Sequence, residues 1–180
     1  STHMPHILSS ALAKMSRHDV SFLCGPSTQG NLLFNILGKI GKGATFGLTT
    51  SGNSHEVLQT MQVVLAEGCA PWGGTAPHEK VEMLQLPLYL VSYFPAEMAQ
   101  TLGEALIEAG ASLKQPVKAF QHTTTTLTVG DMLHAHHSEL AVHLQQHEEQ
   151  RSKSRQEHHM LEKHLQHIRQ AKKNASVSKI

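Results

Sequence analysis

The first 120 residues repeat one order three times: a short apolar run, a turn, and a longer stretch with helical spacing. A continuous apolar run of this length favours a buried strand, and apolar residues three and four positions apart favour a helix. A glycine follows each helical stretch, where it typically ends a helix. The expected strands are residues 20–24, 44–49 and 88–94, and the helices that follow them are residues 31–40, 55–67 and 96–109.

Two further elements flank these three units. Residues 5–16 have helical spacing, and residues 112–120 fit one more strand, while residues 78–86 fit either a short helix or a strand. Strands and helices that alternate along a chain pack as a sheet covered by helices. We therefore expect residues 5–122 to form one α/β or α+β domain, with a small mixed sheet layered with helices.

The pattern changes after this domain. Residues 123–130 are rich in threonine and predict a linker, and the chain from Met132 to Lys172 contains neither glycine nor proline. Apolar positions spaced alternately four and three apart are typical of a coiled-coil seam. We expect a long, histidine-rich helix at residues 131–173, with Asp131 as its N-cap, and a disordered tail at residues 174–180.

The stripe along this helix is apolar at both ends and polar between them. Its centre, residues 151–155, buries poorly, so we expect one rod that packs at its ends; the alternative is a helical hairpin that turns near residues 152–154. We predict that the two end patches bind a partner protein or a second copy of the chain. The patches are Leu133, Leu140 and Leu144 at one end and Leu161, Leu165 and Ile168 at the other.

Overall charge and composition exclude several partners. The formal net charge is +1, from 15 basic and 14 acidic residues, which gives no reason to expect nucleic acid or a membrane surface. No apolar run approaches the roughly 20 residues needed to span a bilayer. The chain has two cysteines, Cys24 and Cys69, which is too few for a disulfide framework. We therefore expect reduced thiols and a cytoplasmic location. No residue pattern indicates a cofactor, and we expect none.

Two segments rich in glycine, serine and threonine each follow a predicted strand and open a predicted helix. A helix N-terminus presents unpaired N–H groups, and hydroxyl groups there add donors for a phosphate. The alternative is that these residues only cap helices and form turns. The candidate phosphate ligands are Ser27, Thr28, Ser51, Asn53 and Ser54.

The chain has 15 histidines, and nine of them follow Gly130. His143 and His147 are four residues apart, and His134 and His137 are three apart, so each pair lies on one face of a helix and can chelate a transition metal. No Cys-x-x-Cys motif or carboxylate cluster completes a four-ligand site, and a solvated helix face is the alternative. No catalytic signature is complete either, which favours a protein that is not an enzyme.

Residues 46–120 resemble the C-terminal domain of the bacterial ribosomal stalk protein, a fold shared with the adaptor of the Clp protease. The resemblance lies in the turn at residues 51–53, the helix that ends at Gly68 and the helical segment at residues 99–111. It implies an interaction module without catalysis. The chain departs from the basic helix face of that family, because glutamine stands at positions 59, 62 and 100 where lysine is expected.

A shorter stretch, residues 48–58, resembles the phosphosugar loop of sugar isomerase domains. That resemblance implies that serine and threonine in the two loops hold a phosphate group. The sequence thus leaves two functions open. The first is a non-enzymatic adaptor or scaffold that docks or oligomerises through its C-terminal helix, and the alternative is a phosphosugar- or phosphate-binding domain. A histidine-rich metal-binding protein is a third possibility.

Overall fold

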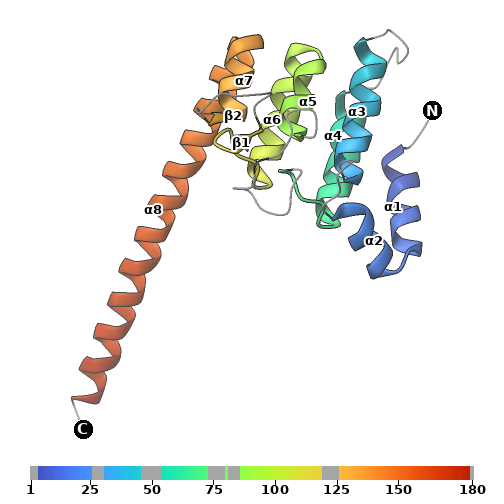
Figure 1. Cartoon of the computed structure of the whole chain (residues 1–180). Helices are drawn as coiled ribbons and strands as arrows, with labels where there is room; N and C mark the ends of the chain where they lie inside the picture. Colours follow the sequence, from blue (N-terminus) through green and yellow to red (C-terminus); the bar gives the residue numbers. More distant parts are fainter. Residues whose placement is uncertain are drawn as a thin grey trace.

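The computed structural model of the full chain describes residues 4–25, 31–45, 54–72, 80, 86–118 and 126–178. These residues form mostly helices with one antiparallel pair of short strands (Figure 1). The predicted α/β or α+β domain with a small mixed sheet is therefore wrong, although the long C-terminal helix is present. The elements are α1 Met4–Lys14, α2 Arg17–Cys24, α3 Leu32–Thr45, α4 Ser54–Ala66, α5 Pro87–Leu90, η2 Val91–Tyr93, α6 Ala96–Glu108, β1 Pro116–Val117, β2 Leu127–Thr128, α7 Val129–His136 and α8 Ser138–Val177.

Helices predicted from periodicity are the part of the expected fold that the structure confirms. α1, α4 and α6 match the predicted helices at residues 5–16, 55–67 and 96–109 to within two residues at each end. Gly68 and Gly110 follow α4 and α6 with φ of 92° and 118°. This left-handed conformation is costly for other residues, so the two glycines let the chain turn away after each helix.

The strand predicted at residues 20–24 is wrong, because this run belongs to α2. The Ser16 hydroxyl accepts a hydrogen bond from the backbone N–H of Asp19 at 3.1 Å, and this cap starts the helix one residue later. Val20 and Cys24, four residues apart, face the core, whereas the side chain of Phe22 is 80% exposed. Burial thus follows a helical period that five residues are too short to reveal.

The other predicted strands fail for a related reason. Residues 88–93 form the end of α5 and the 3₁₀ turn η2, and Phe94 follows that turn. The run is largely apolar in sequence because residues 86–91 are all buried. Of the described residues 112–118, only Pro116 and Val117 are in a strand, which pairs antiparallel with β2; residues 119 and 120 lie outside the described residues. The first residues of the strand predicted at 44–49 end α3, which runs past the glycines expected to stop it, and the rest lie outside the described residues.

α6 lies at the centre of the core. It contacts α4, α5, η2 and α8, and its side chains at Leu102, Leu106 and Ile107 are fully buried. In α5, the pKa of Tyr89 is raised above its ordinary value. The larger cause is burial of its side chain, and the smaller is the neighbouring Tyr93. We call the packed elements from α1 to α7 the body. In the described residues it is built from helices packed on one another and not around a sheet.

A disulfide joins Cys24, at the end of α2, to Cys69, just after α4, so the expectation of reduced thiols is wrong. Next to it, the buried side chain of Asn31 donates hydrogen bonds to the carbonyls of Cys24 at 3.4 Å and Ala70 at 3.0 Å. Its amide oxygen accepts from the N–H of Phe34 at 3.0 Å and thereby caps α3. A bridge across 45 residues stabilises a fold by about 2–4 kcal/mol in the chain-entropy account.

The start of the C-terminal helical region differs from the prediction. Thr128 is the N-cap of α7, and Asp131, which was expected to be the cap, is the third helical residue of a capping box: its carboxylate accepts from the Thr128 N–H at 2.8 Å. The helical path breaks at His137, whose φ of −145° and ψ of 63° are not helical. α8 then continues unbroken past residues 152–154 to Val177, so the hairpin alternative is wrong.

Candidate interaction surface

The first part of α8 packs on α6 through a close approach of the two helices. A Cβ atom at Gly103 of α6 would lie 2.7 Å from Cδ2 and 2.8 Å from Cδ1 of Leu144. Because glycine lacks this atom, the Leu144 side chain lies directly over the α6 backbone and is fully buried. This contact attaches residues 138–151, which we call the docked half of α8, to the body.

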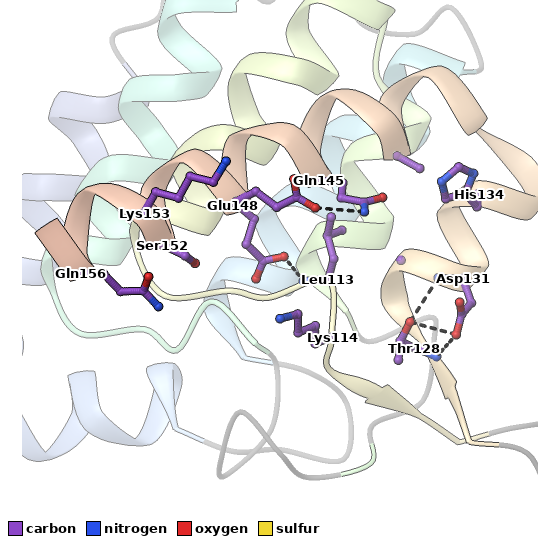
Figure 2. A pocket seen from close by; sticks show the side chains of 13 residues that line it. Leu113, Lys114, Thr128, Asp131, His134, Gln145, Glu148, Ser152, Lys153 and Gln156 are labelled. Carbon is purple, nitrogen blue, oxygen red and sulfur yellow. Dashed lines mark hydrogen bonds between the residues drawn. The ribbon is translucent and has the colours of Figure 1, made fainter.

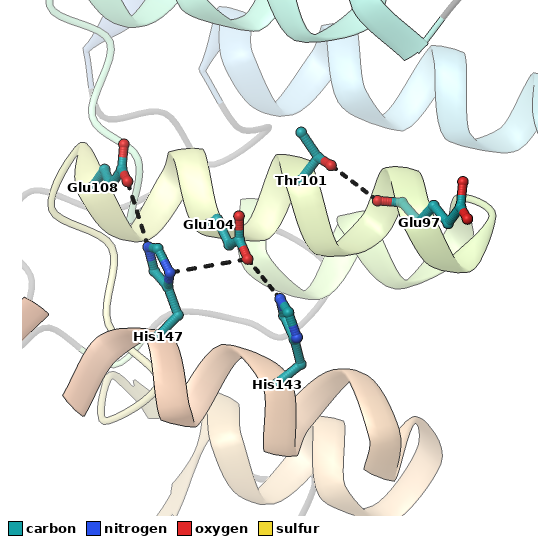
Figure 3. Close-up of polar contacts among 6 residues, drawn as sticks. All are labelled: Glu97, Thr101, Glu104, Glu108, His143 and His147. Atoms are coloured by element: carbon teal, nitrogen blue, oxygen red, sulfur yellow. Dashed lines mark hydrogen bonds and ion pairs between the residues drawn. The ribbon is translucent and has the colours of Figure 1, made fainter. Parts of the chain in front are cut away.

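Polar groups border this contact (Figure 3). The Glu104 carboxylate accepts a hydrogen bond from the His143 ring at 2.6 Å and lies 3.9 Å from Nδ1 of His147. Nε2 of His147 lies 3.5 Å from the Glu108 carboxylate, and the Arg151 guanidinium donates to the backbone carbonyl of Glu108 at 2.7 Å. Because successive residues of α6 meet successive residues of α8, the two helices run in the same direction.

The four histidines predicted to bind a metal are not brought together. His143 and His147 share the Glu104 carboxylate, whereas His134 lies beside a groove on α7 and His137 forms the break before α8. Within the described ranges, no three His, Cys, Asp or Glu side chains converge where a metal ion could sit. His143 and His147 instead make polar contacts with α6 at the border of the Gly103–Leu144 contact.

The phosphate-binding prediction falls mostly on residues that the structure does not describe. Ser27, Thr28, Ser51 and Asn53 lie outside the described residues, and only the backbone of Ser54 is described, as the first residue of α4. The sugar-phosphate alternative therefore stays a prediction.

A groove of about 470 Å³ lies between α7, the segment before β1 and the part of α8 from Ala141 to Gln156, which spans the junction of the docked half with the rest of the helix (Figure 2). Several of its polar groups make hydrogen bonds within the chain. Thr128 and Asp131 are hydrogen-bonded to each other in the capping box of α7, and the Glu148 carboxylate accepts from the backbone N–H of Leu113 at 3.2 Å. Nothing in this arrangement indicates a ligand, and we assign the groove no binding role.

The two apolar patches predicted for a partner have different surroundings. Leu133, Leu140 and Leu144 belong to the core of the body, so they are not available to another protein. The second patch is exposed: Leu161 is 56%, Leu165 is 43% and Ile168 is 40% accessible. One of the two expected docking patches therefore remains on the surface.

We call residues 152–177 the exposed half of α8, because every residue in this range is exposed. This half extends away from the body to the C-terminal end of the chain (Figure 1). Leu161, Leu165 and Ile168 lie on one face of it, since residues three, four and seven apart share a side of a helix. The exposed half thus presents a narrow apolar stripe that no other part of the described chain covers.

Acidic and basic residues are concentrated in different segments of the chain, although the formal net charge is only +1. Residues 1–85 hold five acidic and five basic residues, residues 86–150 hold seven acidic and two basic residues, and residues 151–180 hold two acidic and eight basic residues. The region that carries the docked half is therefore acidic, and the region of the exposed half is basic. This asymmetry is present in the amino-acid sequence itself.

Comparison of the chain with models of known families, with curated proteins and with solved structures finds no match in any of the three. The resemblances to the ribosomal stalk domain and to sugar isomerase domains thus gain no support. Among the described residues, no helix is both long and apolar enough to cross a membrane.

Proposed function

We propose that this chain is a non-enzymatic protein–protein interaction module, in which the helical body holds out the exposed half of α8 as a docking element. The observation that carries the proposal is the apolar stripe of Leu161, Leu165 and Ile168 on a helix that leaves the body. The body supplies a rigid base, because the close contact between Gly103 and Leu144 fixes the other end of the same helix.

Helix energetics support this proposal. Isolated helices are marginal in water, and most helical stability in proteins comes from packing an apolar face. The exposed half spans 26 residues of continuous helix without such packing inside the chain. An amphipathic helix that lays a stripe with this spacing onto another protein is a common mode of recognition. A partner would complete the packing that the exposed half lacks.

Photo-crosslinking from the two faces of the exposed half tests this function. A photoreactive residue at Leu165, on the stripe, should form an adduct with another polypeptide when the full chain is expressed in the cells that produce it. The matched control is the same residue at Gln170, which is also exposed but lies on the opposite face. Equal labelling from both positions, or no intermolecular adduct from position 165, would contradict the proposal.

The disulfide bears on where this function operates. The location predicted from the sequence was cytoplasmic, but disulfides persist mainly in oxidising compartments. The bridge between Cys24 and Cys69 therefore favours an oxidising environment for the folded chain. Blocking thiols during cell lysis and then counting free thiols tests this: we expect none, and two free thiols would restore the cytoplasmic location.

A further inference from the structure

The apolar stripe of the exposed half continues the seam that the docked half forms with α6. Leu144, His147 and Arg151, which are three and four residues apart, all contact α6. The same alternation leads into the stripe through residues 154 and 158. Arg151 reaches the carbonyl of Glu108, where α6 ends. Beyond this point no element of the described chain covers the seam, and a helix laid there would continue the line of α6.

A second copy covers this seam in an antiparallel register that places stripe against stripe. With a two-fold axis midway between Leu165 and Ile168, Leu165 of each copy faces Ile168 of the other. In the next layer on each side, Leu161 faces Lys172, whose aliphatic stem covers the leucine while its ammonium group stays in water. The stripe of each copy is then covered by the stripe and one lysine stem of the other.

This register also keeps the two bodies apart. Residue 156 of one copy faces Val177, the last residue of α8, in the other. The second helix therefore ends before it reaches the docked half, and α6 keeps its place on residues 138–151. At about 1.5 Å per residue, the two Arg151 positions lie roughly 45 Å apart along the pair. Each body lies at its own end of the paired helices.

Charged residues flank the seam on one side. Glu162 directly follows Leu161, and Arg169 directly follows Ile168. A two-fold axis perpendicular to the plane of both helices keeps this flank on the same side of the pair in both copies. Glu162 of one copy and Arg169 of the other then lie between the same two layers, and the contact occurs twice. Flanking charges of this kind determine partner and orientation in paired helices.

The other antiparallel register that matches the stripes brings like charges together. Its two-fold axis lies midway between Leu161 and Leu165, so that these two residues face each other across the pair. Glu162 of one copy then lies against Glu162 of the other, and Arg155 lies against Arg169. The flanking charges thus disfavour this register.

A parallel pair is also disfavoured. Each residue of the seam faces its own counterpart in such a pair, so Lys172 of one copy meets Lys172 of the other. Flanking positions five residues apart approach each other across a parallel pair, which brings Glu157 toward Glu162 at two symmetric contacts. Among the arrangements that place stripe against stripe, the first register therefore has the most favourable charges.

We infer that the partner of the exposed half is a second copy of this chain, bound antiparallel about an axis between Leu165 and Ile168, with Glu162 and Arg169 in reciprocal ion pairs. The inference rests on the proposed function and names its partner. Within one chain, Nε2 of His158 lies 3.3 Å from the Glu162 carboxylate. A carboxylate has two oxygens, so Glu162 accepts from His158 and from Arg169 of the second copy together.

The basic character of the exposed half sets the conditions of the test. Residues 155–178 hold five basic and two acidic residues, so two copies repel each other apart from the Glu162–Arg169 contacts. Salt screens this general repulsion over about 8 Å at physiological ionic strength. Sedimentation equilibrium of the purified full-length chain at that ionic strength, from about 1 μM to about 1 mM, measures the dimer Kd.

A charge swap tests the register. Arg169→Glu alone and Glu162→Arg alone each place like charges at two symmetric contacts, and we expect each to raise Kd about tenfold. The double variant Glu162→Arg/Arg169→Glu restores opposite charges, and its Kd should return to within about threefold of the original value. In a parallel pair, Glu162→Arg would instead place an arginine against Glu157 and lower Kd.

Lys163→Glu is the matched control for charge. It changes the net charge by the same amount as Arg169→Glu, but position 163 lies on the opposite face of the exposed half from the stripe. We expect Kd to stay within about twofold of the original value, because the position is far from the seam. An equal effect of the two variants would mean that only net charge matters and would overturn the inference.

Lys172→Leu tests the register by a gain of affinity. In the inferred pair this variant places leucine against Leu161 at two layers, and we expect Kd to fall at least about tenfold. In the other antiparallel register position 172 faces Ser154, so the variant would change Kd little. An unchanged Kd for Lys172→Leu would therefore overturn the inferred register.

Two other results would also overturn the inference. One is a chain that stays monomeric at every concentration, and the other is a dimer whose affinity the double variant does not restore. If the monomer instead binds a polyanion such as heparin, and Arg169→Glu and Lys163→Glu weaken that binding alike, the exposed half serves an anionic partner and the inference is wrong. Failure of the proposed function has a separate readout, because crosslinking from position 165 reports any partner polypeptide.

Discussion

The two halves of α8 have the same secondary structure and opposite surroundings. In the docked half, Leu140, Ala141 and Leu144 are buried against the body, and His143 and Arg151 make polar contacts with α6. In the exposed half every residue is exposed. The difference teaches that a helical pattern specifies conformation without specifying whether its apolar face finds a partner in the same chain.

Hydrogen exchange should show the largest difference between the halves. In a dilute, monomeric sample, amides of the docked half should exchange only through large-scale unfolding, whereas those of the exposed half should exchange through local fraying and several orders of magnitude faster. Raising the protein concentration should slow exchange in the exposed half alone. Equal protection of both halves in the monomer would contradict the contrast.

Truncating one leucine in each half gives the next largest effect. Leu144→Ala removes a fully buried side chain and should lower the free energy of unfolding by about 3–5 kcal/mol. Leu165→Ala should change the unfolding of the monomer by less than about 0.5 kcal/mol, because its side chain is exposed. Urea denaturation followed by circular dichroism measures both, and similar losses would mean that the exposed half packs on the body.

Gly103→Ala tests how closely the docked half packs on α6. The added methyl group would lie 2.7 Å from the buried Leu144 side chain, so we expect a loss of about 1–2 kcal/mol despite the better helix propensity of alanine. Gly38→Ala in α3 is the control, because a Cβ there meets nothing within 4 Å. That variant should gain about 0.5–1 kcal/mol, and a gain for both variants would contradict the close helix contact.

His143→Ala should have the smallest effect. It removes the hydrogen bond to Glu104, but the two side chains are 37% and 36% exposed, so water weakens the contact. We expect a loss of about 0.5 kcal/mol in the free energy of unfolding at neutral pH. His159→Ala, at an exposed position of the other half, is the control and should cost nothing measurable. A loss above about 2 kcal/mol would show that the His143–Glu104 hydrogen bond contributes to holding the docked half as much as buried side chains do.

The sequence predicts the helices well and the strands poorly. Periodicity over a dozen residues identifies α4 and α6, because many positions have to agree. Five-residue apolar runs such as residues 20–24 look the same in a buried strand and in a buried helical turn, and only the long-range contacts of α2 decide between them. α3 shows the same limit, since it passes through the glycines that were expected to end it.

The candidate surface is predictable only in part. The stripe with two apolar ends is visible in the sequence, but the sequence does not say that Leu133, Leu140 and Leu144 complete the core while the other end stays open. That outcome depends on Gly103 of α6, which has no side chain and therefore lets Leu144 pack on the helix backbone. Gly103 lies far from Leu144 along the chain.

The bridge between Cys24 and Cys69 has one more consequence. It closes a covalent ring whose interior holds both segments rich in glycine, serine and threonine, with Ser27 near one junction and Ser51 in the middle. A reductant would open that ring. α8 lies outside the ring, so the same redox change would leave the packing of α8 on α6 unchanged.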